Sequence, residues 1–226
     1  FEIINLKKNV PKKGTWIATK TIEIVKKNLE QGNQILFFLN RRGYAPFVIC
    51  KNCNKKFQCP NCSVNLVFHK IFNKLLCHYC GYKCPLSRTC NSNTECEILM
   101  CGPGVERIYS ELKLIFPNKK IEIFSSDLLI KNKSNRKLID RIEKHKVDII
   151  VGTQLISKGF HFPKLNCIVV VDADLSSHGY DLRSAEKNIQ LFHQLAGRAG
   201  REGKKSAIYF QTYTPGDEIL LNISKN

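Results

Sequence analysis

The sequence predicts an α/β fold, in which a parallel sheet with helices on both faces is interrupted by a small cysteine-rich zinc module. Two observations predict it. Short apolar runs, typical of strands buried on both faces, alternate along the chain with segments that have apolar residues at helical spacing. Most cysteines are concentrated in one stretch that interrupts this alternation. We therefore expect the first part of the sheet domain in residues 1–49, a zinc-binding insertion in 50–96 and the rest of the sheet domain in 97–226.

The strands and helices can be placed in order from these patterns. Phe1–Leu6 alternates apolar and polar residues like a short strand, and a helix is expected over Thr19–Glu30, with Gly32 just past its end. Gln34–Leu39 is an apolar run, which predicts a strand inside a parallel sheet. Further strands are expected at Glu97–Cys101, Ile121–Phe124, Asp148–Val151, Cys167–Val171 and Ser206–Gln211, and further helices over 105–115, Asn135–His145 and Ser184–Ala199.

Composition and charge narrow the function. The chain has 226 residues, 43% of them hydrophobic, so it can hold one ordinary core and a small metal module. No apolar run approaches the length of a membrane span. The formal net charge is +17, and two zinc ions with eight thiolates would leave about +13. This excess favours a polyanionic partner, although an even spread of surface lysines is the alternative explanation.

The cysteines have the spacing of zinc ligands. Three Cys-x2-Cys pairs begin at Cys50, Cys59 and Cys77, and Cys90 follows. A tight turn presents two thiolates to one metal, and a second pair closes a tetrahedral structural site. There is no Asp or Glu between Cys50 and Cys90, so thiolates are the anions available there. A disulfide framework is the alternative, and the lack of a signal-peptide pattern weakens it.

Seven or eight thiolates make two sites of four. A partner for Cys90 at the same spacing is missing, because Asn93 occupies that position. Either Cys96 or Cys84 supplies the eighth thiolate, or one site is incomplete and binds its metal more weakly.

Two further motifs have the chemistry of phosphate binding. Gly152-Thr153-Gln154 follows a predicted strand, and Ser157-Lys158-Gly159 comes soon after. Small and hydroxyl residues at a strand end let backbone N–H groups approach a phosphate, although a plain turn has the same composition. Farther along, Gln194 is followed by Gly197-Arg198 and Gly200-Arg201. These two arginines either project towards phosphates or form a solvated basic helix end.

The combination of these segments resembles the PriA family of replication restart DNA helicases. The resemblance rests on QILFFLNRRGYAP (residues 34–46), the cysteine module, GPGVER, IVGTQLISKGFHFP and QLAGRAGREGK. It implies the second RecA-like lobe of a superfamily 2 helicase, with IVGTQLISKG as motif V and QLAGRAGR as motif VI.

By that resemblance, Gln194, Arg198 and Arg201 act at the ATP γ-phosphate. The residues that couple nucleotide state to DNA contacts are then Arg41, Arg42, Gly152, Thr153, Gln154, Lys158 and Gly159. The implied zinc ligands form two groups, Cys59, Cys62, Cys77 and Cys80 in one, and Cys50, Cys53 and Cys90 with the position of Asn93 in the other.

Half of an ATP site is expected to be missing. No G-x-x-x-x-G-K-[ST] phosphate loop occurs, and no Glu follows Asp172-Ala173-Asp174, which we interpret as a strand-end turn with helix-capping carboxylates. ATP and Mg²⁺ are therefore expected only with an upstream lobe, and the chain alone is not expected to hydrolyse ATP. Because the first residue is Phe1, we expect a piece of a longer protein.

The resemblance also implies partners. These are DNA forks and single strands, primosome proteins and single-stranded DNA-binding protein. The implied location is the bacterial cytoplasm, in association with the nucleoid. The alternative function is a non-catalytic zinc-containing fragment of a truncated helicase that binds nucleic acid or protein.

Overall fold

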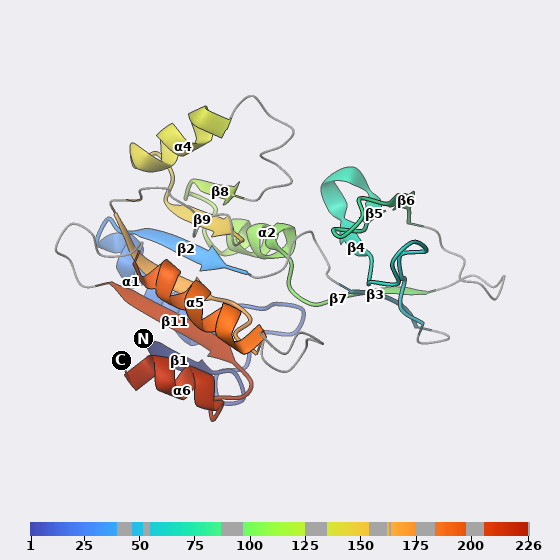
Figure 1. Cartoon of the computed structure of the whole chain (residues 1–226). Helices are drawn as coiled ribbons and strands as arrows, with labels where there is room; N and C mark the ends of the chain where they lie inside the picture. The colour runs from blue at the N-terminus through green and yellow to red at the C-terminus, as the bar shows by residue number, and fades with distance from the viewer. Residues whose placement is uncertain are drawn as a thin grey trace. The chain divides into compact units, whose positions relative to one another are not determined.

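The computed structural model describes residues 1–39, 47–51, 55–86, 97–124, 135–153, 162, 164–174, 184–197 and 206–225. The chain divides into two compact units, shown in Figure 1. The first unit, Phe1–Asn40 with Glu111–Asn226, contains the large sheet. The second unit, Arg41–Ser110, contains the cysteine pairs. Among the helices that the structure describes, none has both the length and the apolar character that a membrane span requires.

The first unit is built on a six-stranded sheet in which every neighbouring pair is parallel. The strand order is β1-β11-β10-β2-β9-β8. The apolar run that the sequence analysis placed inside a sheet is β2, and all of its residues are buried. The strands are β1 (Glu2–Asn5), β2 (Gln34–Phe38), β8 (Ile121–Phe124), β9 (Ile149–Gly152), β10 (Leu165–Val170) and β11 (Ala207–Thr212).

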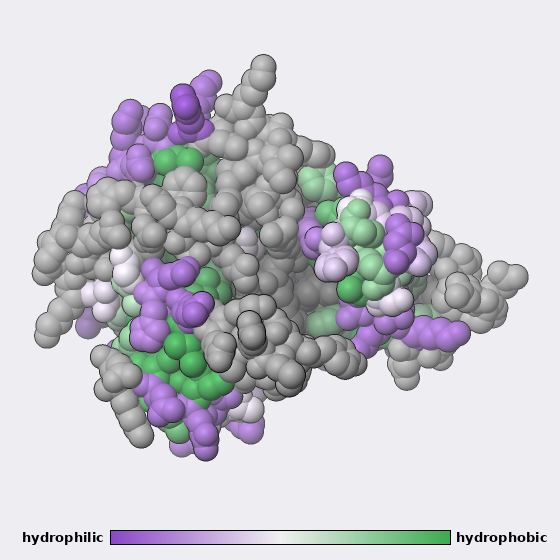
Figure 2. Space-filling view, in the orientation of Figure 1, coloured by the Kyte–Doolittle hydropathy of each residue, from purple (hydrophilic) through white to green (hydrophobic). Residues whose placement is uncertain are grey.

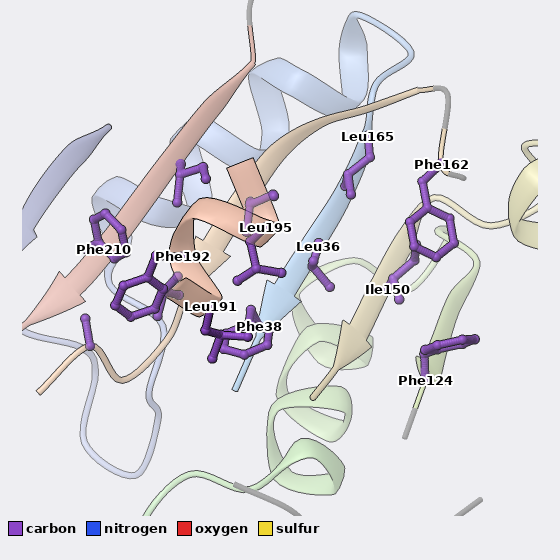
Figure 3. Close-up of a cluster of buried hydrophobic side chains, with 14 of the residues drawn as sticks. Leu36, Phe38, Phe124, Ile150, Phe162, Leu165, Leu191, Phe192, Leu195 and Phe210 are labelled. Carbon is purple, nitrogen blue, oxygen red and sulfur yellow. The ribbon is translucent and has the colours of Figure 1, made fainter. Parts of the chain in front are cut away.

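Helices cover both faces of this sheet, as predicted. On one face, Leu36 and Phe38 of β2 belong to a buried cluster that includes Phe192 of α5. The opposite face is covered by α1, which contacts β2 and β10. Figure 3 shows α5 in front of the strands and α1 behind them. The helices are α1 (Thr19–Glu30), α2 (Val105–Ile115), α4 (Asn135–Glu143), α5 (Ser184–Ala196) and α6 (Glu218–Lys225).

A buried glutamine fastens α1 to the sheet. The side chain of Gln211, on β11, is fully buried. Its Oε1 accepts hydrogen bonds from the Ala18 N–H at 3.0 Å and from the Thr21 hydroxyl at 2.7 Å. Its Nε2 donates to the carbonyl of Val171 at 3.2 Å. Because an unmade hydrogen bond is costly in the core, these contacts fix where α1 begins relative to β11.

The second unit is antiparallel. β3 (Phe47–Cys50) pairs with β7 (Ile98–Cys101), and β5 (Lys74–Leu76) lies between β4 (Val67–His69) and β6 (Lys83–Pro85), with a 3₁₀ turn η1 (Lys70–Phe72) after β4. Its core is small and contains two of the cysteines. The buried members are Val48, Cys59, Leu66, Phe68, Leu75 and Cys77.

The expectation that every strand outside the cysteine module joins the parallel sheet was wrong for one strand. The predicted strand at Glu97–Cys101 exists as β7, but it pairs antiparallel with β3. The reason is burial: β2 is buried on both faces, whereas no β7 residue is fully buried and Leu99 is 42% exposed. A short apolar run occurs both in strands buried on both faces and in strands that are partly exposed, so the sequence alone does not distinguish the two.

The sequence analysis also missed helix α6. α6 is short, and the Asp217 carboxylate caps it by accepting the N–H groups of Ile219 and Leu220. Asp174 was expected to cap a helix. In the described residues it accepts hydrogen bonds from the hydroxyl of Thr212 and from the N–H and hydroxyl of Thr214, in the turn after β11. These contacts hold the pKa of Asp174 below its usual value, although desolvation opposes the shift.

Candidate metal centre

Four of the predicted ligands converge in the second unit. The sulfur atoms of Cys59, Cys62, Cys77 and Cys80 all lie within 4.8 Å of one another. Individual distances between sulfur atoms are 3.5 Å for Cys59 and Cys80, and 3.4 Å for Cys62 and Cys77. Zinc with bonds to sulfur of about 2.3 Å in a tetrahedron requires sulfur atoms about 3.8 Å apart. The four thiols therefore fit a closed tetrahedral zinc site.

Each cysteine pair lies in the same kind of backbone turn. The Cys59 N–H donates to the carbonyl of Val64, and the Cys77 N–H donates to the carbonyl of Tyr82, both at 2.8 Å and both five residues ahead. The residue after each second cysteine has a positive φ, 56° at Ser63 and 79° at Gly81. This geometry turns the two sulfurs of a pair towards the same point. We call each such turn a knuckle.

A third turn begins in the same way. The Cys50 N–H donates to the carbonyl of Lys55 at 2.9 Å, again five residues ahead. Cys50 itself is buried at the end of β3 and is not a member of the four-cysteine group. The predicted partners of Cys50, which are Cys53, Cys90 and Cys96, lie outside the described residues.

The thiols compete for protons when no cation neutralises them. Desolvation, followed by hydrogen bonds with the thiols of Cys77 and Cys59, raises the pKa of Cys62 to about 12. Desolvation also opposes ionisation of Cys77, but the N–H groups of Cys80 and Tyr79 and the neighbouring thiols outweigh it and lower the pKa of Cys77 to about 6. A divalent cation is what allows all four sulfurs to be thiolates at once.

The sequence analysis did not anticipate a buried polar chain beside the second knuckle. His78, which follows Cys77, has its Nε2 atom 3.0 Å from Nε2 of His69. The other ring nitrogen of His69 lies 3.4 Å from a carboxylate oxygen of Glu106, at the start of α2. His69 is 2% exposed and Glu106 is 7% exposed. Lone histidines and one carboxylate, far apart in the sequence, gave no spacing signal that could have predicted this chain.

The predicted nucleotide residues are described only in part. Gly152 and Thr153 are buried where β9 ends, and the Gly152 carbonyl accepts the N–H of Leu39 at 2.9 Å. Gln194 is exposed on α5. The remaining predicted residues lie outside the part of the chain that the structure describes: Arg41, Arg42, Gln154, Lys158, Gly159, Arg198 and Arg201.

Two family models match the chain. Residues 59–85 match the PriA DNA helicase Cys-rich region domain, which contains all four cysteines of the cluster. Residues 79–203 match the helicase conserved C-terminal domain, which is more than half of the chain.

Relatives match along nearly the whole chain. The replication restart protein PriA of Rickettsia felis is 44% identical over 226 residues, which are 100% of this chain and 35% of that protein. The protein of the same name from Bacillus subtilis is 36% identical over 198 residues, 88% of this chain and 25% of that protein. The chain thus spans well under two thirds of the length of these relatives.

A solved structure agrees on the fold. The structure of RecG bound to a three-way DNA junction aligns with 99% of this chain and 19% of that chain, with a TM-score of 0.50 and 12% sequence identity. At this identity the likeness concerns the fold alone.

Proposed function

Because this chain belongs to the PriA family and forms the C-terminal helicase lobe of that family, we propose that it is the second half of an ATP-dependent 3′→5′ DNA helicase that initiates replication restart. The observation that carries this proposal is the occurrence, on one chain, of a four-thiol cluster and a parallel helicase-type sheet. From the sequence we propose the domain boundaries 1–49, 50–96 and 97–226; β3 and β7 pair with each other at the two ends of the insertion, so its compact unit extends beyond these bounds.

The end of the large sheet supports a role in nucleotide-linked strand binding. Open parallel sheets bind ligands at the carboxyl ends of their strands. Gly152 and Thr153 lie at such an end, and the hydrogen bond from Leu39 to Gly152 holds the ends of β2 and β9 together. In the sequence, Arg41 and Arg42 follow soon after β2. We propose that these segments contact the DNA phosphates and respond to bound nucleotide.

ATP and Mg²⁺ belong to an upstream lobe in this proposal. Gln194, Arg198 and Arg201 are assigned to the γ-phosphate that such a lobe would present. Arginine donors stabilise the charge that develops on the γ-phosphate oxygens in the transition state, and they act across the cleft between lobes.

The metal has a structural role in this proposal. Cys59, Cys62, Cys77 and Cys80 hold one zinc ion, whose four thiolates leave no position for a reacting water. The repeated knuckle hydrogen bond at Cys50 supports a second zinc site there. Bound zinc cross-links the two knuckles and so stabilises the fold of the cysteine module.

The proposed partners follow from the family. They are forked and single-stranded DNA, the primosome proteins that load next, and single-stranded DNA-binding protein, all in the bacterial cytoplasm. The exposed lysines of the second unit favour contact with a polyanion.

ATP hydrolysis by a two-lobe protein tests the proposal. The chain is fused behind the preceding part of the Rickettsia felis protein, and DNA-stimulated hydrolysis is measured beside DNA affinity. We expect Arg201→Ala to lower turnover by about 10³-fold while DNA affinity is kept, because the lost contact forms in the transition state. Arg136→Ala, which changes an exposed arginine on α4, is the matched control and should be neutral.

Two outcomes would contradict the proposal. A fusion that folds and never hydrolyses ATP would favour the alternative of a non-catalytic zinc-containing fragment. Near-normal hydrolysis by the Arg201→Ala protein would end the assignment of that arginine to the γ-phosphate.

A further inference from the structure

We propose that Tyr79, at the tip of the second knuckle, is a stacking platform for a base of single-stranded DNA. This inference rests on the proposed function and adds to it a specific contact in the cysteine module. Three independent observations carry it: the exposure of the ring, the rigidity of its support and the charge around it.

The aromatic ring of Tyr79 is largely exposed to solvent. Its side chain is 83% exposed, whereas its neighbour His78 turns inward to meet His69. The equivalent tip of the first knuckle is the polar residue Asn61, whose amide reaches Cys80 Sγ at 3.9 Å. A single exposed apolar side chain is common on any surface. An exposed aromatic ring on a turn that carries two metal ligands is less common, and the face of such a ring is available to a flat ligand.

The turn that carries Tyr79 is fixed from inside. The Cys77 N–H donates to the carbonyl of Tyr82 at 2.8 Å, and the Cys80 N–H donates to Cys77 Sγ at 3.5 Å. These two hydrogen bonds close the turn on both sides of Tyr79.

The chain of polar contacts from half-buried His78 through buried His69 to buried Glu106 adds a second anchor. Glu106 also accepts the N–H of Lys70 at 2.9 Å, so its carboxylate is held while it faces His69. Because His78 is the residue directly before Tyr79, this chain limits the freedom of the turn. A ring that is already fixed loses little conformational entropy when a base stacks on it.

The charge of the module selects a nucleic acid over a protein. Within the described stretch 55–86 there is no aspartate or glutamate. A zinc ion with four thiolates contributes about −2, so the stretch stays positive. Lysine is depleted at protein–protein interfaces, whereas phosphates attract it. The exposed lysines are Lys55, Lys56, Lys70, Lys74 and Lys83.

Stacking on an aromatic ring also suits the proposed substrate. Every base has a π face, so stacking is tolerant of sequence, which a helicase requires. Lysines that track the backbone and an aromatic ring that takes a base are together the usual elements of single-strand binding.

The test compares variants of the full 226-residue chain, loaded with zinc, in binding to a short fluorescent oligothymidine and to an oligonucleotide that carries 2-aminopurine. We expect Tyr79→Ala to weaken binding about tenfold and to abolish the quenching of 2-aminopurine that stacking causes. Tyr79→Phe, which keeps the ring, should retain both. Leu114→Ala is the matched control, because Leu114 is 85% exposed on α2 and outside the module.

Zinc content and melting temperature show that each variant has folded. Binding that is unchanged in Tyr79→Ala would overturn the inference and leave the ring as a protein-docking residue. An unmodified chain that does not bind the oligonucleotide at low salt would overturn it as well. Neither result bears on ATP hydrolysis by the two-lobe protein, so a failure of this inference and a failure of the proposed function are distinguishable.

Discussion

Replacing Cys77 by serine should remove one zinc ion per chain and unfold the cysteine module without unfolding the large sheet. Cys77 is fully buried, and its sulfur lies 3.4 Å from that of Cys62. A serine hydroxyl does not ionise at neutral pH and is not among the ligands of structural zinc sites. The site is therefore left with three thiolates and an open position.

The size of the effect follows from the module's small core. Its large buried apolar side chains are Val48, Leu66, Phe68 and Leu75. At about 1.5–3 kcal/mol each they contribute roughly 6–12 kcal/mol, an upper estimate. A structural zinc ion contributes about 10–16 kcal/mol of apparent binding free energy at neutral pH. The metal thus supplies about as much as the apolar core, and the module cannot lose it and stay folded.

Zinc content and amide hydrogen exchange measure the result. A chromogenic chelator, added after the thiols are blocked, counts zinc per chain. Exchange should become fast at the N–H groups of Cys59 and Cys77, which close the knuckles, while β2 in the large sheet stays protected. Cys101→Ser is the matched control, because Cys101 is a half-buried thiol of the same unit outside the four-cysteine group. Full zinc content in the Cys77→Ser protein would refute the reasoning.

Two further predictions concern a carboxylate and the second metal site. Asp174 has a lowered pKa, so its hydrogen bonds stabilise the fold above the carboxyl's unfolded pKa near 3.8 and lose that effect as the pH falls through the folded pKa. Asp174→Asn should therefore lower the free energy of unfolding by about 1–2 kcal/mol at neutral pH, a modest loss because the carboxylate is half-exposed. The melting temperatures of the two proteins should become equal in acid. A difference that persists in acid would contradict this reasoning. Cys96→Ser should remove the second zinc ion, whereas Cys84→Ser should not, and the same chelator counts the zinc. Loss of zinc in Cys84→Ser alone would assign the eighth thiolate to Cys84.

The sequence predicted those parts of the fold whose burial is uniform. β2 and β10 are buried on both faces, so each forms an unbroken apolar run that an isolated sequence reveals. The helix expected over Thr19–Glu30 begins and ends at those residues, because its apolar spacing and the glycine after it agree. The cysteines could be predicted as zinc ligands because the ligand turn is local and its spacing is strict, whereas the grouping of four of them rested on the family resemblance.

The rest depended on contacts that no local pattern records. β7 has as many apolar residues as a buried strand, and only its pairing with β3 shows that it belongs to the second unit. The chain that runs from His78 to Glu106 joins residues that are distant in sequence and of types that occur singly everywhere. Only the folded structure brings these residues together, so no pattern in the sequence could have predicted the contact.

The assignment of Cys96 rather than Cys84 rests on the contact between Glu97 and the turn that begins at Cys50. The N–H of Lys51, directly after Cys50, donates to the carbonyl of Glu97 at 2.8 Å, and their side chains form an ion pair at 2.7 Å. Cys96 directly precedes Glu97 in the sequence, so we expect Cys96, rather than Cys84, to supply the eighth thiolate at the turn that begins at Cys50. Cys84 is instead held in β6 opposite Leu75 and packs on the core that contains Cys59 and Cys77. We therefore expect the eighth thiolate from the segment just before β7 in the sequence, and not from β6.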